Sequence, residues 1–119
     1  EPQTIERTLR EILADPEISV IVTNGSTGIS ARDNAYEVVS GLLEKRLDGF
    51  GELFRSLSFS EIGAAAMLSR AVAGTVGKKV LFSLPGSSNA VKLGMTQLIL
   101  PQAAHLVYEL NRHSQPEAS

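Results

Sequence analysis

In the first half of the chain, segments whose apolar residues have helical spacing alternate with a continuous β-branched run that is typical of a strand. Helical spacing over residues 3–14 predicts an amphipathic helix, carried by Ile5, Leu9, Ile12 and Leu13. The β-branched run 18–23, which leads into Asn24 and Gly25, is typical of a buried parallel strand that ends in a tight turn. Asn34 and Glu37 have the spacing of a capping box, and the apolar positions after them predict a second helix as far as about Arg46.

The second half of the chain continues this alternation. A short helix is predicted over residues 52–57, while the small residues 63–66 fit more than one element. Residues 67–73 and 79–84 are predicted to be adjacent strands joined by the glycine-bearing segment 74–77, with one of them antiparallel to the main sheet. Apolar positions from Val91 to Ile99 predict a helix, which Pro101 should interrupt before a last helix through Leu110.

Strands that alternate with helices favour an α/β sandwich. The 119 residues suffice for one hydrophobic core, so a single domain is expected over residues 1–113, followed by a flexible tail over 114–119. With 43% hydrophobic residues and no apolar run of about 18 residues, membrane attachment is not expected. The net charge of −2, without a lysine or arginine cluster, argues against a nucleic-acid partner. The absence of cysteine excludes thiolate chemistry and suits a cytoplasmic protein.

The first candidate for binding chemistry is the segment between the predicted strand 18–23 and the helix after it. Ligands of open α/β sheets bind where strands end and helices begin. Glycines allow close backbone approach and hydroxyls donate to phosphate or pterin groups, so the candidate ligand contacts are Gly25, Ser26, Thr27, Gly28 and Ser30. An ordinary turn would use the same residue types. Asp33 fits either a metal or ligand carboxylate or a helix cap, and Arg32 either a phosphate clamp or a surface pair.

The second candidate is the segment Pro85, Gly86, Ser87 and Ser88, which again joins a strand end to a helix start. The unpaired N–H groups of a helix start favour an anion there. At least one of Ser87, Ser88 and Asn89 is expected to cap the helix. The two candidate segments can therefore face each other across one site.

Other polar residues are better explained by structure. Glu52 and Arg55 have the spacing of a helical ion pair, and the aromatic residues around them suit a core. His105 lies among apolar helix positions, where packing or surface roles are commoner than ligand binding. The segment 74–79 is not a P-loop, because its glycines are too close together and no Ser or Thr follows the lysine.

Four segments, in order, resemble motifs of the MoaB/Mog family, which is related to the gephyrin G domain. Residues 23–33 resemble its TTGGTG and PRD segment, residues 49–55 its GFGELFR, residues 68–71 its LSRA, and residues 84–87 its LPG(N/S) loop. Together these segments cover nearly the whole chain.

The resemblance implies a three-layer α/β/α sandwich with a mostly parallel sheet and one antiparallel edge strand, commonly assembled as a trimer or a higher homo-oligomer. It also implies that the chain binds molybdopterin and joins it to AMP from Mg-ATP, with release of pyrophosphate. Asp33 would be the catalytic carboxylate and the Mg²⁺ ligand, and residues 25–28 the backbone cradle. Ser87, with the amides of Gly86 and Ser88, would hold the pterin or its phosphate.

The chain departs from the family pattern at three positions of the first segment. Asn24 replaces a threonine, Ser26 a glycine and Ala31 the proline. The family also has an N-terminal strand, a helix and a second acidic residue in a segment that would precede Glu1, and we expect this chain to lack that strand segment. A catalytically silent binding or oligomerisation module is therefore the alternative to an adenylyltransferase.

Overall fold

The computed structural model describes residues 2–25 and 35–112. Its mixed sheet has four strands in the order β1-β4-β3-β2. Their bounds are Val20–Asn24 (β1), Lys45–Arg46 (β2), Val72–Val76 (β3) and Lys79–Leu84 (β4). β1 and β4 are parallel neighbours, and β3 runs antiparallel to both β4 and β2. The predicted α/β class with one antiparallel strand is confirmed, but β3 is not the edge strand because the two-residue β2 pairs along its outer side.

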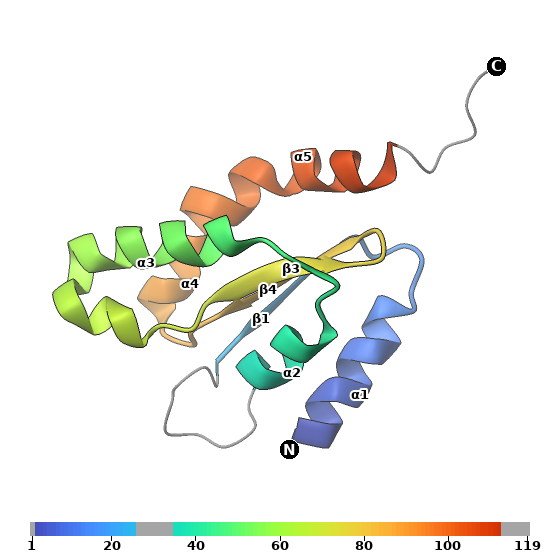
Figure 1. The fold of residues 1–119 in the computed structure, drawn as a ribbon, viewed down its shortest axis with the longest axis horizontal. Helices are drawn as coiled ribbons and strands as arrows, with labels where there is room; N and C mark the ends of the chain where they lie inside the picture. The colour runs from blue at the N-terminus through green and yellow to red at the C-terminus, as the bar shows by residue number, and fades with distance from the viewer. Residues whose placement is uncertain (1, 26–34, 113–119) are drawn as a thin grey trace.

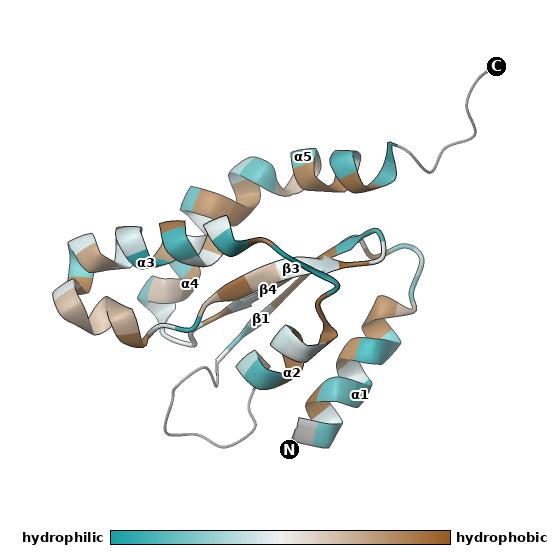
Figure 2. Ribbon diagram, viewed as in Figure 1, coloured by the Kyte–Doolittle hydropathy of each residue, from teal (hydrophilic) through white to brown (hydrophobic). Residues whose placement is uncertain are grey.

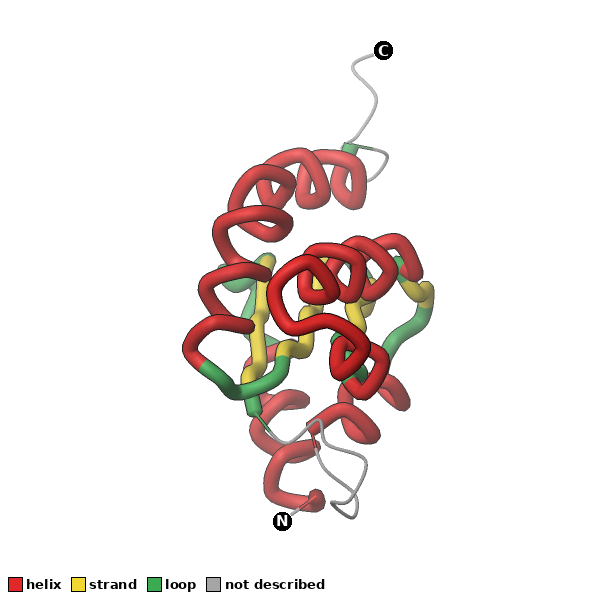
Figure 3. The backbone as a smooth tube through the Cα atoms, turned by 90° about the vertical axis from the view of Figure 1, so that its left-hand side faces the viewer, coloured by secondary structure: helices red, strands yellow, loops and turns green. Residues whose placement is uncertain are grey.

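Helices cover both faces of the sheet, which gives the three predicted layers (Figures 1 and 3). One layer holds α1 (Pro2–Leu13) and α2 (Ala35–Leu42). The other holds α3 (Asp48–Ile62), the 3₁₀ segment η1 (Gly63–Leu68), α4 (Ser88–Gly94), the π turn η2 (Met95–Ile99) and α5 (Leu100–Asn111). None of the helices in residues 2–25 and 35–112 has both the length and the hydrophobicity that a bilayer span needs.

Alternate residues of β4 divide the core into two clusters, because successive side chains of a strand point to opposite faces of its sheet. Val80, Phe82 and Leu84 pack with Phe50 and Phe54 of α3 and with Ile99 on one face. Leu81 packs with Leu9 of α1, Val39 of α2 and Ile21 on the other. Apolar residues, brown in Figure 2, run along β3 and β4 between the two helical layers.

The helix predicted over residues 3–14 is confirmed as α1, and the strand predicted over 18–23 is β1. The second helix was predicted to extend to Arg46, but it ends at Leu42, because residues 45–46 pair with β3 instead. The short helix predicted over residues 52–57 is part of the longer α3. The predicted tail 114–119 lies outside the described residues.

The two strands predicted from residue 67 onwards form a hairpin, but the prediction placed its first strand and its turn too early in the chain. Met67 and Leu68 belong to η1, and Gly74 lies inside β3 and not in the connection. A Cβ at Gly74 would lie 2.3 Å from the carbonyl oxygen of Lys45, so this glycine is explained by the close approach of β2 and not by a turn. The turn lies at residues 77–78, where Gly77 has a φ of +61°, a value that favours glycine.

Pro101 does not interrupt the last helix, contrary to the prediction. The π turn η2 comes directly before α5, and the Leu100 N–H donates to the carbonyl of Met95, five residues earlier. Proline has no N–H, and its ring crowds the carbonyl four residues earlier in an α-helix. The wider turn accommodates both effects, so the helical path is continuous from Ser88 to Asn111.

Candidate functional site

The two candidate segments meet at the carboxyl ends of β1 and β4. In this parallel pair, Thr23 lies beside Ser83 and Asn24 beside Leu84. The Gly25 N–H then donates to the carbonyl of Leu84 over 2.9 Å, beyond the last residue of β1. Because the strands are neighbours and parallel, the chain leaves both of them at the same edge of the sheet.

Gly25 and Gly86 bring the two backbones into direct contact. A Cβ added at Gly86 would lie 2.8 Å from the Cα and 3.3 Å from the nitrogen of Gly25. Gly25 itself has a φ of +95°, a backbone conformation that residues with a Cβ rarely adopt. Both glycines are therefore required by the geometry of this edge, one by its backbone conformation and the other by the close approach.

The segment 85–88 leads from β4 into α4. Ser87 is the N-cap of α4, and its Oγ accepts a hydrogen bond from the Ala90 N–H over 3.1 Å. This confirms that one of the three polar residues caps the helix. Gly86 and Ser88 are exposed beside it, and Pro85 is half-buried.

The remaining predicted contacts lie outside the described residues: Ser26, Thr27, Gly28, Ser30, Arg32 and Asp33. The part of the chain that the structure describes contains no cluster of three or more His, Asp or Glu side chains suited to a metal ion. The Mg²⁺ contact of Asp33 therefore stays a prediction.

A pocket of about 230 Å³ borders the second segment, on the side of α3 and η1. Its lining is mostly apolar, with hydroxyls at Ser58 and Ser69 and a carboxylate at Glu61. The full lining is Phe54, Ser58, Glu61, Ile62, Ala65, Leu68, Ser69, Pro85, Ser87, Asn89, Ala90 and Leu93. A pocket with apolar walls and a few polar groups is the usual form of a small-molecule site. Sequence reasoning missed Ser58 and Glu61, whose i, i+3 spacing on α3 was the available signal.

Residues 69–71 reach the same edge, because β3 begins at Val72, which lies opposite Ser83. Arg55 of α3 donates from Nη1 to the carbonyl of Ala71 over 3.2 Å and to that of Ser69 over 3.4 Å. This contact replaces the predicted pair of Glu52 with Arg55. The motifs around residues 49–55 and 68–71 thus form one structural unit.

Gly51 provides the space for this unit. A Cβ there would lie 2.7 Å from Nη2 of Arg55 and 2.8 Å from the carbonyl oxygen of Ala71. We expect Gly51→Ala to lower the free energy of unfolding by about 1–3 kcal/mol, because the crowded carbonyl is backbone and must shift. Urea denaturation measures the loss. Gly49→Ala is the matched control on the same helix, since a Cβ there has nothing within 4 Å, and an equal loss in both variants would contradict the steric explanation.

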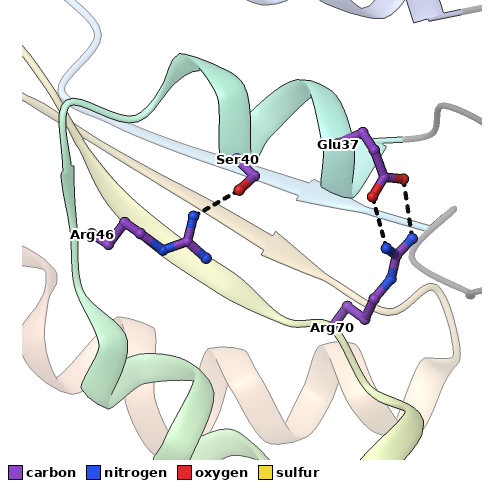
Figure 4. Close-up of polar contacts among 4 residues, drawn as sticks. All are labelled: Glu37, Ser40, Arg46 and Arg70. Carbon is purple, nitrogen blue, oxygen red and sulfur yellow. Dashed lines mark hydrogen bonds and ion pairs between the residues drawn. The ribbon is translucent and has the colours of Figure 1, made fainter.

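The side chain of Arg70, which lies just before β3, contacts α2 in the other helical layer. Its guanidinium donates to both carboxylate oxygens of Glu37, over 2.7 and 3.1 Å, and lies 4.3 Å from the centre of the Tyr36 ring. Figure 4 shows this contact beside a second one, from Arg46 Nη1 to Ser40 Oγ over 2.7 Å. Glu37, predicted as half of a capping box with Asn34, therefore binds Arg70, while Asn34 lies outside the described residues.

Ser83 is a fully buried polar residue close to this edge. It lies in β4, and within residues 2–25 and 35–112 its Oγ has no hydrogen-bond partner. It lies one residue before Leu84, whose carbonyl accepts from Gly25. No sequence pattern singles it out, because a lone serine in a strand is common.

Over residues 1–105 the sequence matches the family described as "probable molybdopterin binding domain". The chain belongs to this family. Among its relatives, the molybdenum cofactor biosynthesis protein B of Bacillus cereus is 57% identical over 97 residues, which are 81% of this chain and 57% of the relative. The protein of the same name from Staphylococcus carnosus is 52% identical over 111 residues, 92% of this chain and 65% of the relative. The chain thus spans about three fifths of the length of these relatives.

Solved structures of the family have the same fold. A crystal structure of a molybdenum cofactor biosynthesis protein B is 50% identical, with a TM-score of 0.90 over 94% of this chain and 70% of that one. The tungsten cofactor synthesizing protein MoaB of Pyrococcus furiosus is 38% identical, with a TM-score of 0.83 over 92% of this chain and 69% of that one. The MoaB/Mog resemblance of the motifs is therefore confirmed.

Proposed function

We propose that the chain acts in molybdenum cofactor biosynthesis and binds molybdopterin at the edge where β1 and β4 end. The observation that carries the proposal is the direct approach of Gly25 and Gly86, beside a pocket of about 230 Å³. The membership of the family described as a "probable molybdopterin binding domain" supports the choice of ligand.

The pocket suits the pterin half of the ligand. A pterin is a flat heterocycle with hydrogen-bonding groups at its edge, so it needs apolar walls and a few polar contacts. Phe54, Ile62 and Leu68 are among the apolar lining residues. The Glu61 carboxylate can accept from the amino edge of the ring.

Ser87 suits the phosphate half. Its Oγ already accepts a hydrogen bond from the Ala90 N–H. The hydroxyl can still donate a hydrogen bond through its own proton. A phosphate oxygen accepts such a proton, and Ser87 borders the same pocket. The backbone amides of Gly86 and Ser88 would add further donors.

We further propose that this binding serves adenylyl transfer in the cytoplasm. A phosphate oxygen of molybdopterin would attack the α-phosphorus of ATP, forming adenylyl-molybdopterin as the bond to the departing pyrophosphate breaks. Such a reaction needs mainly positioning and charge neutralisation. Ser26, Thr27, Gly28, Ser30 and Arg32 would contact the nucleotide, and Asp33 would hold Mg²⁺, which binds through phosphates and one or two carboxylates.

The altered glycine segment favours one alternative, a module that binds molybdopterin without turnover. Asn24 and Ser26 stand where the family motif has a threonine and a glycine. A ligand on this segment would then be held without the close approach that transfer needs.

Ser87→Ala tests the binding site. We expect calorimetry to show roughly tenfold weaker molybdopterin binding, because a hydrogen bond to a charged group is lost. Ser56→Ala is the matched control, since Ser56 is an exposed serine of α3 outside the pocket lining. Undiminished binding by the Ser87 variant, or no binding by the unaltered chain, would contradict the proposal.

Release of pyrophosphate from Mg-ATP, measured with and without molybdopterin, separates the two functions. Molybdopterin-dependent release that falls strongly in Asp33→Asn supports the adenylyltransferase. Binding without release supports the silent module.

We also propose that the chain assembles as a homo-trimer or a higher homo-oligomer. Four large apolar side chains around the end of α3 and η1 are exposed in the single chain, between 55% and 79%: Phe59, Ile62, Met67 and Leu68. Exposed apolar clusters of this kind commonly mark interfaces. Sedimentation velocity tests the assembly, and a monomer at all accessible concentrations would contradict it.

A further inference from the structure

Ser58 is a buried polar residue in the α3 wall of the pocket. It is 8% exposed and lines the pocket. No hydrogen bond joins its Oγ to another of the described residues. A hydroxyl inside a helix usually faces solvent or bonds to the carbonyl four residues earlier, as Thr96 does with Lys92. Ser58 does neither, so its hydroxyl is open to a molecule in the pocket.

The Ser58 hydroxyl has a cost that the packing of the protein does not offset. A buried polar group without a hydrogen-bond partner destabilises the folded state. Alanine would also be the better helix former at this position of α3. Stability alone therefore favours alanine here, and a ligand that pairs with the hydroxyl explains the serine.

Glu61 lies one helical turn further along the same wall. Its i, i+3 spacing places it on the same face of α3 as Ser58, and both residues line the pocket. Glu61 is exposed, and its carboxylate has no ion pair or hydrogen bond with the other described residues. A carboxylate only accepts hydrogen bonds, so the wall presents two acceptor oxygens at Glu61 and a donating hydroxyl, more deeply buried, at Ser58.

The charge of Glu61 orients a phosphorylated ligand in the pocket. Among the described residues that line it, none is a lysine or an arginine that could offset this charge. A phosphate is therefore repelled from the α3 wall. Ser87 belongs to the opposite wall, which the segment after β4 forms. The phosphate end thus lies toward Ser87, and the heterocycle presents its edge to Glu61 and Ser58.

We infer that Glu61 and Ser58 are the specificity-determining pair of this pocket and select a heterocycle with a 2-amino-4-oxo edge. The Glu61 carboxylate accepts from the amino group and from the neighbouring ring N–H, and the Ser58 hydroxyl donates to the oxo group beside them. The inference rests on the proposed function, because a pterin has this edge. A heterocycle with an oxygen in place of the amino group turns an acceptor toward the carboxylate and is rejected.

Titrations with pterin and with lumazine, followed by ligand fluorescence, measure the selection. Lumazine has an oxygen where pterin has the amino group. The unaltered chain should bind pterin at least roughly tenfold more tightly, because lumazine loses a hydrogen bond to a charged group. In Glu61→Gln the ratio should fall to about threefold or less, since the amide can turn an N–H toward the lumazine oxygen. Glu52→Gln is the matched control, at an exposed position of α3 outside the lining, and should keep the ratio.

Ser58→Ala separates a ligand contact from a structural role. It should weaken the binding of pterin and of lumazine by about fivefold each, because both have the oxo group and one neutral hydrogen bond is lost. The ratio between the two ligands should not change. The urea midpoint should not fall, since the variant removes an unpaired buried hydroxyl. Ser60→Ala is the control, because Ser60 is exposed and outside the lining, and it should leave both Kd values unchanged.

Equal Kd values for pterin and lumazine in the unaltered chain, or an unchanged ratio in Glu61→Gln, would overturn the selection. Molybdopterin binding without measurable binding of pterin would do the same, since the heterocycle would then not be recognised. A lower urea midpoint with unchanged Kd values in Ser58→Ala would make Ser58 a structural residue. In all these cases, molybdopterin binding that depends on Ser87 would leave the proposed function intact. A chain that binds neither molybdopterin nor pterin would overturn both.

Discussion

Gly86→Ala is expected to weaken molybdopterin binding roughly 100-fold, because losing two hydrogen bonds to a charged phosphate, at about 1.5 kcal/mol each, corresponds to a factor of that size. The new Cβ would lie 2.8 Å from the Cα of Gly25, and neither backbone can rotate away as a side chain can. Gly25 is also held by its hydrogen bond to Leu84. The two segments must therefore separate, and the site between them widens.

Calorimetry with molybdopterin measures the loss, and urea denaturation shows how much of it is accompanied by destabilisation. Gly41→Ala is the matched control, because a Cβ at that glycine of α2 has nothing within 4 Å. The control should bind normally. Unchanged binding in Gly86→Ala would show that the contact of the two segments is not part of the site.

Phe82→Ala is expected to have the largest effect on stability, lowering the free energy of unfolding by about 3–5 kcal/mol. Phe82 is 2% exposed on β4, which lies between β1 and β3, and its ring meets that of Phe50 edge to face at a centroid distance of 5.0 Å. The substitution removes most of a buried aromatic side chain. Neighbours on a sheet cannot collapse fully into the cavity.

Tyr108→Ala also removes an aromatic ring, at a position of α5 that is 61% exposed and lies outside the proposed oligomer interface. Measured by urea denaturation, it should cost less than about 1 kcal/mol, as surface substitutions usually do. Similar losses for the two variants would contradict the assignment of Phe82 to the core.

Local sequence signals predicted the elements well where a single helix face or strand carries them. The spacing of Ile5, Leu9 and Ile12 predicted α1, because these residues line the buried side of one helix. The predictions failed where a neighbour decides the local conformation. Gly74 was assigned to a turn because it is a glycine, yet it lies in a strand whose neighbour comes too close for a Cβ.

In the candidate site, too, a contact between sequence neighbours was predicted and a contact between distant residues was not. Ser87 was predicted among the capping residues, since a hydroxyl before a helix has an unpaired N–H to bind. Arg55 was paired with Glu52 by helical spacing, but its guanidinium binds carbonyls 14 and 16 residues further along the chain. Contacts across such distances depend on the path of the chain between them.

The sequence by itself determined most of the alternating elements, the cap of α4 and the order of the motifs that resemble the family, because these depend on neighbours within a few positions. Only the tertiary structure decided that β1 and β4 are adjacent, that Gly86 meets Gly25, and that Arg70 binds α2. Strand order and layer contacts join residues that are far apart in the chain. They depend on how the hydrophobic faces of all the elements pack together, which no single segment encodes.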